Sequence, residues 1–380
     1  MRYFFVFIVQ PIFGWHDLFL IKALRPKFIE RAHRLFGLGF IVFWVSGCSD
    51  IETVSNKQVW HLSTWGNPRA VTTVIETVAS EVARESKGSF EIKIHFGEAV
   101  SPSRQNLESL SIGLVDAAQT CSSYHPGKTP AMTALELPFL PIDDLKQTIK
   151  VHKAFYDLPV VKAELKNWNA QLLFLVPTPQ PEFMGNGEPP LTIADWDKKR
   201  VRATGGLAQA MIELGASPVG VPPPEVYLGL ERNLFQAAAF PYSYAFGAYR
   251  LFEVSDWYTT NMKAAGFNCP VLVNKDSYAA LNADHKAILD AAIDVAYSAQ
   301  QDAFDVADEK WLKVFDENSL TAIAYEPSLL TEFRIIAADP VWQKWRASVA
   351  RYDVEGDAVI KDLLRIIEDF KIVEGEKDGT

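Results

Sequence analysis

The side chains of this chain that could do chemistry form no recognisable catalytic group. The histidines lack the His-Glu-x-x-His spacing of a zinc site, and no Gly-x-Ser-x-Gly turn exposes a nucleophilic serine. Gly205-Gly206 lacks the further glycines of a dinucleotide-binding loop. Cys121 with His125 would suit a thiol nucleophile, but a cysteine near a loop histidine is more often structural. We therefore expect no catalytic residue, no metal site and no cofactor.

One arginine stands where an anion could be recognised. The segment 198–205 (KKRVRATG) has the pattern of a strand that ends in a small, flexible turn, with Arg202 beside the turn. A guanidinium offers paired donors in the plane of a carboxylate, whereas lysine offers only a point charge. On spacing alone, an arginine at the end of an exposed strand is more often just solvated, so the pattern leaves both interpretations open.

Helices and strands alternate along the chain, which predicts an α/β fold. Asn67-Pro68 has the pattern of a helix start, and valines at helical spacing continue to Gly88. Residues 90–96 then alternate between apolar and polar, as in a strand with one buried face. The density of Pro and Gly over 177–190 is incompatible with a helix or a central strand, so we predict a crossover between lobes there.

A helix, a turn and a strand occur in this order twice, about 120 residues apart. In the first unit Gly113 follows the helix and 114–118 is expected to be a buried strand; in the second, Asn233 and 234–238 take these places. Asn is the commonest substitute for Gly where a positive φ is needed. We interpret the two units as lobes built alike, although such units also recur in unrelated α/β proteins.

The C-terminal third is predicted to be helical. Residues 284–315 contain no Pro or Gly and carry an apolar stripe, so we expect a helix about 45 Å long that spans both lobes. The pattern from Pro340 to Ile372 is also helical and is expected to pack on the outside.

The N-terminal segment resembles a bacterial lipoprotein signal. Arg31 and Arg34 precede an apolar run, and Val45-Ser46-Gly47-Cys48 follows it. Cys48 is then the expected lipidation site, and a short buried helix with a chance cysteine is the alternative. Of the other cysteines, Cys121 and Cys269 could form a disulfide in an oxidising compartment, but we favour two buried thiols.

The net charge argues against one class of partner. The chain has 37 basic and 47 acidic residues, a formal charge of −10. This balance gives no electrostatic footprint for a phosphate backbone, so nucleic acid is not an expected partner. An acid-binding pocket in such a protein must supply its own positive charge.

Several motifs together resemble the solute-binding proteins of tripartite ATP-independent periplasmic (TRAP) transporters. The resemblance runs from about Trp60 to Glu326 and rests on the following segments: 114–118, Leu137-Pro138-Phe139-Leu140, 198–205, Glu225-Val226-Tyr227 and 230–238. It implies a type II, Venus-flytrap fold of two lobes that close on a carboxylate, and membrane subunits as partners. It also implies that Arg202 forms a bidentate salt bridge with the ligand.

The resemblance suggests further pocket residues with less force, since each could equally be core packing. From the first lobe these are Trp65, Asn67, Ser122, Ser123 and Tyr124, and from the second Glu182, Tyr227, Gln236, Phe240 and Tyr242.

Two departures from the family pattern bear on the ligand. Glu182 stands where many members carry a further arginine, and Gln236 with Ala237 replaces residues that are usually Asp and Gly. We therefore expect a monocarboxylate, or an acid whose second group is neutral or positive.

The predicted organisation has four parts: a signal segment at 1–48, lobe I from 56–179 and 268–307, lobe II from 180–267 and 308–361, and a C-terminal tail at 362–380. The expected function is periplasmic capture of a small organic acid without catalysis. A two-domain enzyme acting on a carboxylate and a ligand-sensing module for a receptor stay open as alternatives.

Overall fold

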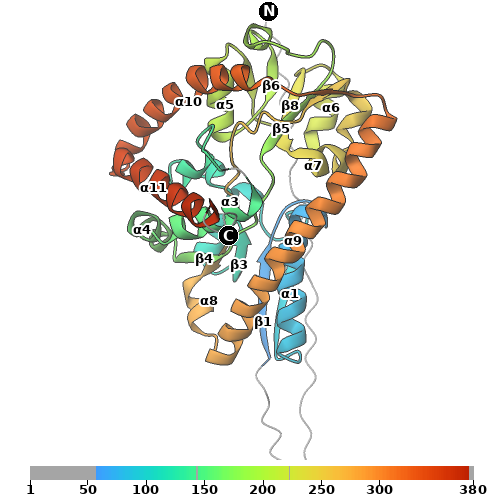
Figure 1. The fold of residues 1–380 in the computed structure, drawn as a ribbon. Helices are drawn as coiled ribbons and strands as arrows, with labels where there is room; N and C mark the ends of the chain where they lie inside the picture. Colours follow the sequence, from blue (N-terminus) through green and yellow to red (C-terminus); the bar gives the residue numbers. More distant parts are fainter. Residues whose placement is uncertain (1–56, 143, 222, 376–380) are drawn as a thin grey trace, which may run out of the picture. The chain divides into compact units, whose positions relative to one another are not determined.

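The computed structural model describes residues 57–142, 144–221 and 223–375, which contain two sheets flanked by helices (Figure 1). The predicted signal segment and Cys48 lie outside the described residues. The α/β fold with two lobes is confirmed. We call the first sheet and the helices packed on it lobe I, and the second sheet with its helices lobe II.

Lobe I is built on a five-stranded sheet in the order β2-β1-β3-β10-β4. The strands are β1 (Gln58–Ser63), β2 (Phe90–His95), β3 (Ala117–Gln119), β4 (Ala170–Phe174) and β10 (Val271–Asn274). Strand β10 is antiparallel to both neighbours, whereas β1 is parallel to β2 and β3. The helices are α1 (Thr73–Glu85), α2 (Asn106–Ser111), α3 (Leu145–Tyr156), α4 (Pro159–Asn167) and α8 (Lys275–Ala279).

Lobe II is built on a six-stranded sheet in the order β11-β9-β5-β8-β6-β7. The strands are β5 (Pro181–Gly185), β6 (Arg200–Arg202), β7 (Ser217–Val219), β8 (Ala237–Pro241), β9 (Trp257–Thr259) and β11 (Thr321–Ile323). The helices are α5 (Gly205–Glu213), α6 (Val226–Glu231) and α7 (Tyr242–Ala248). The chain crosses from one sheet to the other three times: after β4, after β9 and after β10.

The predicted long helix is confirmed as α9 (Ala283–Glu317), which has 35 residues and is therefore about 52 Å long. It packs on α1 in lobe I and on α7 in lobe II (Figure 1). Gln300, in its middle, is fully buried and accepts a hydrogen bond from the Val74 amide at 2.8 Å. One helix thus contributes to the core of both lobes.

The C-terminal helices also divide between the lobes. Helix α10 (Pro327–Ala350) packs on α5, and α11 (Gly356–Gly375) packs on α3. The first of them begins well before Pro340, which lies inside it. The predicted boundary between 361 and 362 falls within α11, whose Leu363 and Ile367 are buried in lobe I, so residues 362–375 are not a separate tail. The other lobe boundaries stay a prediction.

The two helix–turn–strand units have the same turn. Gly113 and Asn233 have φ of +74° and +52°, and each amide bonds back to a leucine carbonyl, of Leu110 and Leu230 respectively. The next residue was expected to begin a buried strand, and this is wrong. Leu114 and Leu234 are 56% and 59% exposed, because their amides bond to the preceding helix and the strands begin three residues later.

Two local predictions are corrected near the prolines. Helix α1 begins at Thr73, not at Asn67-Pro68, because Arg69 is extended and its amide donates to Thr72 Oγ1 at 2.8 Å. The Pro-rich stretch contains a central strand, β5, paired with both β8 and β9. The strand tolerates Pro181 because this is its first residue, where a missing N–H costs little.

The preference for two free thiols is also wrong, because Cys121 and Cys269 form a disulfide. Strand β10 runs antiparallel to β3 with Val271 opposite Gln119, so the two cysteines face each other just beyond the paired strands. Their Cα atoms are 4.0 Å apart, although 148 positions separate them in sequence. Only the pairing of β3 with β10 brings them together.

A buried carboxyl lies where the lobes touch. Glu136 of lobe I accepts hydrogen bonds from Ser122 Oγ at 2.7 Å and from the Ser123 amide at 3.0 Å. It faces the start of α5 in lobe II, where a Cβ on Gly206 would stand 2.0 Å from the Glu136 carbonyl oxygen. Burial raises the pKa of Glu136 to about 7.

Removing the disulfide should destabilise the protein. We expect the double variant Cys121→Ser, Cys269→Ser to lose about 2–4 kcal/mol of unfolding free energy, because the bond closes a long loop in the unfolded chain. Urea unfolding with and without a reductant checks this. The reductant should destabilise the wild type and leave the double variant unchanged; equal sensitivity of both would contradict the prediction.

The buried carboxyl should make stability depend on pH. Its pKa is higher in the folded than in the unfolded protein, so its contribution is complete below about pH 4.5 and lost as the pH rises through about 7. Glu136→Gln should therefore lose less unfolding free energy than the wild type between these pH values, by up to about 3 kcal/mol. Urea unfolding across this range checks it, with the exposed Glu188→Gln as control. Parallel curves for all three proteins would refute the assignment.

Candidate functional site

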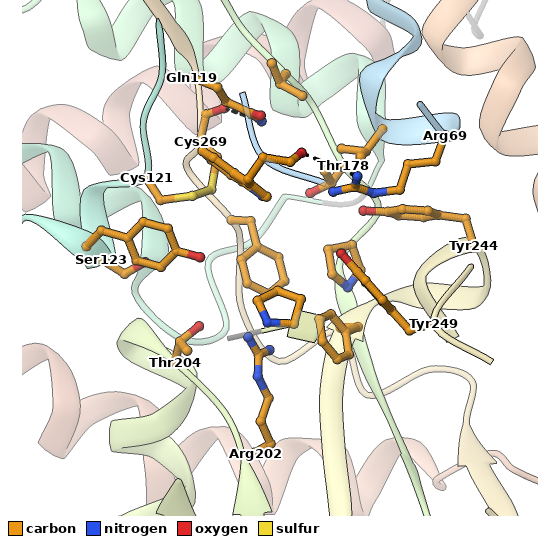
Figure 2. Close-up of a pocket in the computed structure, with 18 residues that line it drawn as sticks. Arg69, Gln119, Cys121, Ser123, Thr178, Arg202, Thr204, Tyr244, Tyr249 and Cys269 are labelled. Carbon is orange, nitrogen blue, oxygen red and sulfur yellow. Dashed lines mark hydrogen bonds between the residues drawn. A yellow bond between two sulfur atoms is a disulfide. The ribbon is translucent and has the colours of Figure 1, made fainter. Parts of the chain in front are cut away.

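A cavity lies between the two lobes. Its inner part has a volume of about 80 Å³ and its outer part of about 620 Å³, and the two share lining residues. Lobe I contributes Trp65, Arg69, Gln119 and Tyr124, and lobe II contributes Arg202, Phe240, Tyr244 and Tyr249 (Figure 2). The disulfide forms part of the inner wall. Both lobes thus present polar and aromatic groups to one space.

Arg202 is the central cation of this cavity. It ends strand β6 and is 4% exposed. Its Nε donates to the Val221 carbonyl at 3.2 Å and its Nη1 to the Ala239 carbonyl at 2.9 Å, which holds the plane of the guanidinium. Burial lowers its pKa to about 10, so it stays protonated at neutral pH. Among the described residues no carboxylate forms a salt bridge with it.

Aromatic rings surround this guanidinium. The Phe240 ring lies beneath it, with the guanidinium carbon 4.3 Å from the ring centre. Tyr249 packs against Phe240 with ring centres 5.4 Å apart. On the opposite wall the ring centres of Trp65 and Tyr124 are 5.9 Å apart. The burial of Tyr124 raises its pKa, so its hydroxyl is neutral and can donate a hydrogen bond. The cavity can hold an anionic head and a flat apolar body.

Arg69 brings a second guanidinium to the same cavity (Figure 2). Its Nη1 donates to the Asn67 carbonyl at 2.8 Å and to the Trp65 carbonyl at 3.5 Å. Its Nε is buried and has no hydrogen-bond partner among the described residues. A third arginine, Arg104, lines the outer part and lies 4.9 Å above the Tyr124 ring. The cavity therefore supplies strong positive charge within an acidic chain.

The structure brings six of the predicted site residues to this cavity. Five line it beside one another: Arg202, Trp65, Ser123, Tyr124 and Phe240. Asn67 lines only its outer part. Ser122 is buried behind the wall, where its hydroxyl binds Glu136.

Four predicted residues do not line the cavity. Tyr227 points to Glu253, 3.4 Å away, and the Gln236 side chain accepts from the Arg200 amide at 2.9 Å. Glu182 and Tyr242 line a separate cavity of about 240 Å³ on another side of the crossover. The Glu182 carboxyl there accepts hydrogen bonds from Thr259 and from the amides of residues 262 and 263. The polar atoms of three of these residues are thus occupied by other parts of the protein.

Sequence reasoning missed several residues that line the cavity: Arg69, Arg104, Gln119, Thr178, Thr204, Tyr244 and Tyr249. A signal existed for Arg69, because a basic residue follows Asn67-Pro68 directly and Asn67 was itself expected at the pocket. Tyr244 and Tyr249 lie in and after the short helix α7, whose sequence carries no motif.

The part of the chain that the structure describes contains neither a cluster of metal ligands nor a membrane-spanning helix. No group of three or more His, Cys, Asp or Glu side chains in it could hold a metal ion. None of its helices is both long and apolar enough to cross a membrane.

Relatives of this chain are known from sequence. It is 26% identical over 251 residues to the ectoine/5-hydroxyectoine-binding periplasmic protein UehA of Ruegeria pomeroyi, a match that covers 64% of this chain and 73% of the relative. It is 23% identical over 307 residues to a monocarboxylate 2-oxoacid-binding periplasmic protein of a Nostoc species, with 76% and 83% covered.

Solved structures have the same fold. A marine metagenome TRAP solute-binding protein with 3-hydroxybenzoate superposes with a TM-score of 0.73 at 22% identity, covering 82% of this chain and 98% of the other. One from Rhodoferax ferrireducens with benzoate has a TM-score of 0.72 at 21% identity, covering 83% and 99%.

The family is decided by a match that covers most of the chain. Residues 63–348 match the model of the DctP family, described as bacterial extracellular solute-binding protein, family 7. This range includes both sheets apart from most of β1, and every residue named above as lining the cavity. The chain is a member of the bacterial extracellular solute-binding proteins of family 7.

Proposed function

We propose that this protein is the solute-binding subunit of a TRAP-type transporter, which captures a small organic acid in the cavity between its lobes and delivers it to membrane subunits. The observation that carries this proposal is the burial of Arg202 in the cavity wall. This cation has no carboxylate partner among the described residues. Burying an unpaired charge is costly, so such a group is retained where a ligand supplies the opposite charge. A carboxylate is the anion that fits a planar guanidinium best.

Arg202 would bind the acid in an orientation set before the ligand arrives. Two backbone carbonyls already hold its guanidinium, so little side-chain entropy is lost on binding. The surrounding apolar walls exclude water and thereby strengthen the ion pair. Both effects favour a carboxylate over a neutral ligand.

The body of the ligand would pack against aromatic side chains. Trp65, Tyr124 and Phe240 present ring surfaces on two sides of the cavity. Flat acids suit such walls, because rings and planar groups stack with large contact area. This agrees with the aromatic acids bound by two structural neighbours, 3-hydroxybenzoate and benzoate.

Closure of the lobes would complete the site. The ligand touches residues of both lobes, so it favours the closed arrangement and shifts an existing equilibrium toward it. Gly206 allows the start of α5 to approach Glu136 closely, and this contact would form as the lobes close. The closed form would then dock on the membrane subunits.

We further propose a periplasmic location, in line with the two curated relatives. Lipidation at Cys48 would anchor the protein to a membrane, and this stays a prediction from the sequence. An enzymatic role is not part of the proposal, because no nucleophile paired with a base lines the cavity among the described residues.

Arg202 provides the first test. Arg202→Ala should abolish detectable binding of benzoate or any other acid that the wild type binds, and Arg202→Lys should weaken it about 10- to 100-fold, because lysine lacks the paired donors. Isothermal calorimetry measures the affinities, and the exposed Arg200→Lys on the same strand serves as control. Acid binding that survives in Arg202→Ala at full strength would refute the proposal, and turnover of the acid would favour the enzyme instead.

A substitution at Gly206 tests whether the two lobes close on the ligand. A methyl group on Gly206 would collide with the Glu136 backbone, so Gly206→Ala should lower the affinity for the acid about tenfold or more and keep the radius of gyration large when ligand is added. Gly220→Ala is the matched control, since a Cβ at Gly220 meets no atom within 4 Å. Small-angle scattering with and without ligand checks this. Identical behaviour of the two variants would argue against a closing contact at Gly206.

A further inference from the structure

The cavity contains a second guanidinium whose position is built by the surrounding chain. Arg69 lies on the connection between β1 and α1, and the carbonyls of Asn67 and Trp65 accept from its Nη1. Gly66 makes room for it, because a Cβ there would stand 2.1 Å from that nitrogen. Gly66 also has a φ of +70°, which other residues rarely adopt. The tip of Arg69 is therefore held in place and not simply solvated.

One nitrogen of this guanidinium lacks a hydrogen-bond partner in the part of the chain that the structure describes. This is the buried Nε, and leaving a buried donor unpaired is unfavourable. Within residues 57–142, 144–221 and 223–375 no Asp or Glu lines the inner cavity, and Glu98 in the outer part already accepts a hydrogen bond from the Ser103 amide. The inner wall thus offers Arg69 no internal counter-charge.

Arg69 and Arg202 come from different lobes. Arg69 belongs to lobe I, and its guanidinium carbon lies 5.9 Å from the centre of the Tyr249 ring. Arg202 ends a strand of lobe II, and its guanidinium lies above the Phe240 ring. Tyr249 packs against Phe240 at an angle of 34° between the ring planes, so each of the two cations lies against one ring of the same aromatic pair. A ligand that reaches both would bridge the lobes through two charged contacts.

We propose that Arg69 is a second ligand-anchoring residue and that the bound acid carries a second carboxylate, which Arg69 binds while Arg202 binds the first. This rests on the proposed function of the cavity. It replaces the expectation of a monocarboxylate, which assumed that Glu182 had taken the place of the only other arginine. Glu182 lies in a separate cavity, and the second cation comes from another element.

The test compares acids that differ by one carboxylate. Calorimetry measures three pairs with wild type and Arg69→Gln: benzoate with isophthalate, propionate with succinate, and pyruvate with 2-oxoglutarate. The wild type should bind at least one diacid about tenfold or more tightly than its monoacid, as expected for a charge-assisted pair. In Arg69→Gln this ratio should fall to near one, while the monoacid affinity changes little.

Two further variants separate charge from folding. Arg84→Gln removes a positive charge from the exposed face of α1 in the same lobe and should keep the diacid preference. Gly66→Ala keeps all charges but displaces the tip of Arg69, so it should reduce the preference as well. It serves as the second variant if Arg69→Gln fails to fold.

The outcomes distinguish this inference from the proposed function. If wild type prefers no diacid, or if Arg69→Gln weakens monoacid and diacid equally, the second-carboxylate proposal is overturned while acid binding by Arg202 stands. If no acid binds in an Arg202-dependent way, the proposed function fails and this inference fails with it.

Discussion

A positive charge buried without a protein carboxylate shapes this molecule. Arg202 is almost entirely removed from solvent, and in the described part of the chain its charge is stabilised by two backbone carbonyls and an aromatic ring, without a salt bridge. Keeping a cation in such surroundings requires a rigid frame, because the side chain would otherwise turn toward water. The end of β6, paired with β8 and β7, supplies that frame. The cavity, its aromatic walls and the meeting of the lobes are all arranged about this charge.

The frame extends through both lobes by way of α9. This helix packs on α1 and α7 and buries Gln300 at its centre, so the core of lobe I continues into that of lobe II. Helices α10 and α11 repeat this connection on another face, since one packs on α5 and the other on α3. Motion between the lobes must therefore bend or slide these helices and cannot come from a loose linker alone.

Much of the fold could be predicted from local sequence patterns. The long helix, the strand at 90–95 and the paired positive-φ turns at Gly113 and Asn233 follow from periodicity and turn chemistry, which act over a few residues. Arg202 was found through its motif. What local patterns could not predict depends on distant partners. The strand β5 is central because β8 and β9 flank it, and the disulfide exists because β10 returns beside β3.

The cavity was only partly predictable for the same reason. Trp65 and Tyr124 follow strands and Phe240 lies near the end of β8, and the ends of these strands meet there, so their place could be inferred. The sequence pattern predicts a helix through Arg69, whereas this residue lies before α1 and its position depends on the turn at Gly66. Tyr227 and Gln236 lie in matching motifs, yet they bond to neighbours in their own lobe. A motif thus indicates the right region but not the direction of every side chain.

The disulfide has a topological consequence. Strands β5 to β9, with α5 to α7, all lie between Cys121 and Cys269 in sequence, so most of lobe II belongs to a covalently closed loop that also includes α3, α4 and β4 of lobe I. A single backbone cut inside this loop would leave both fragments tethered until a reductant opens the bond. A chain cut there therefore stays in one covalent piece as long as it resides in an oxidising compartment.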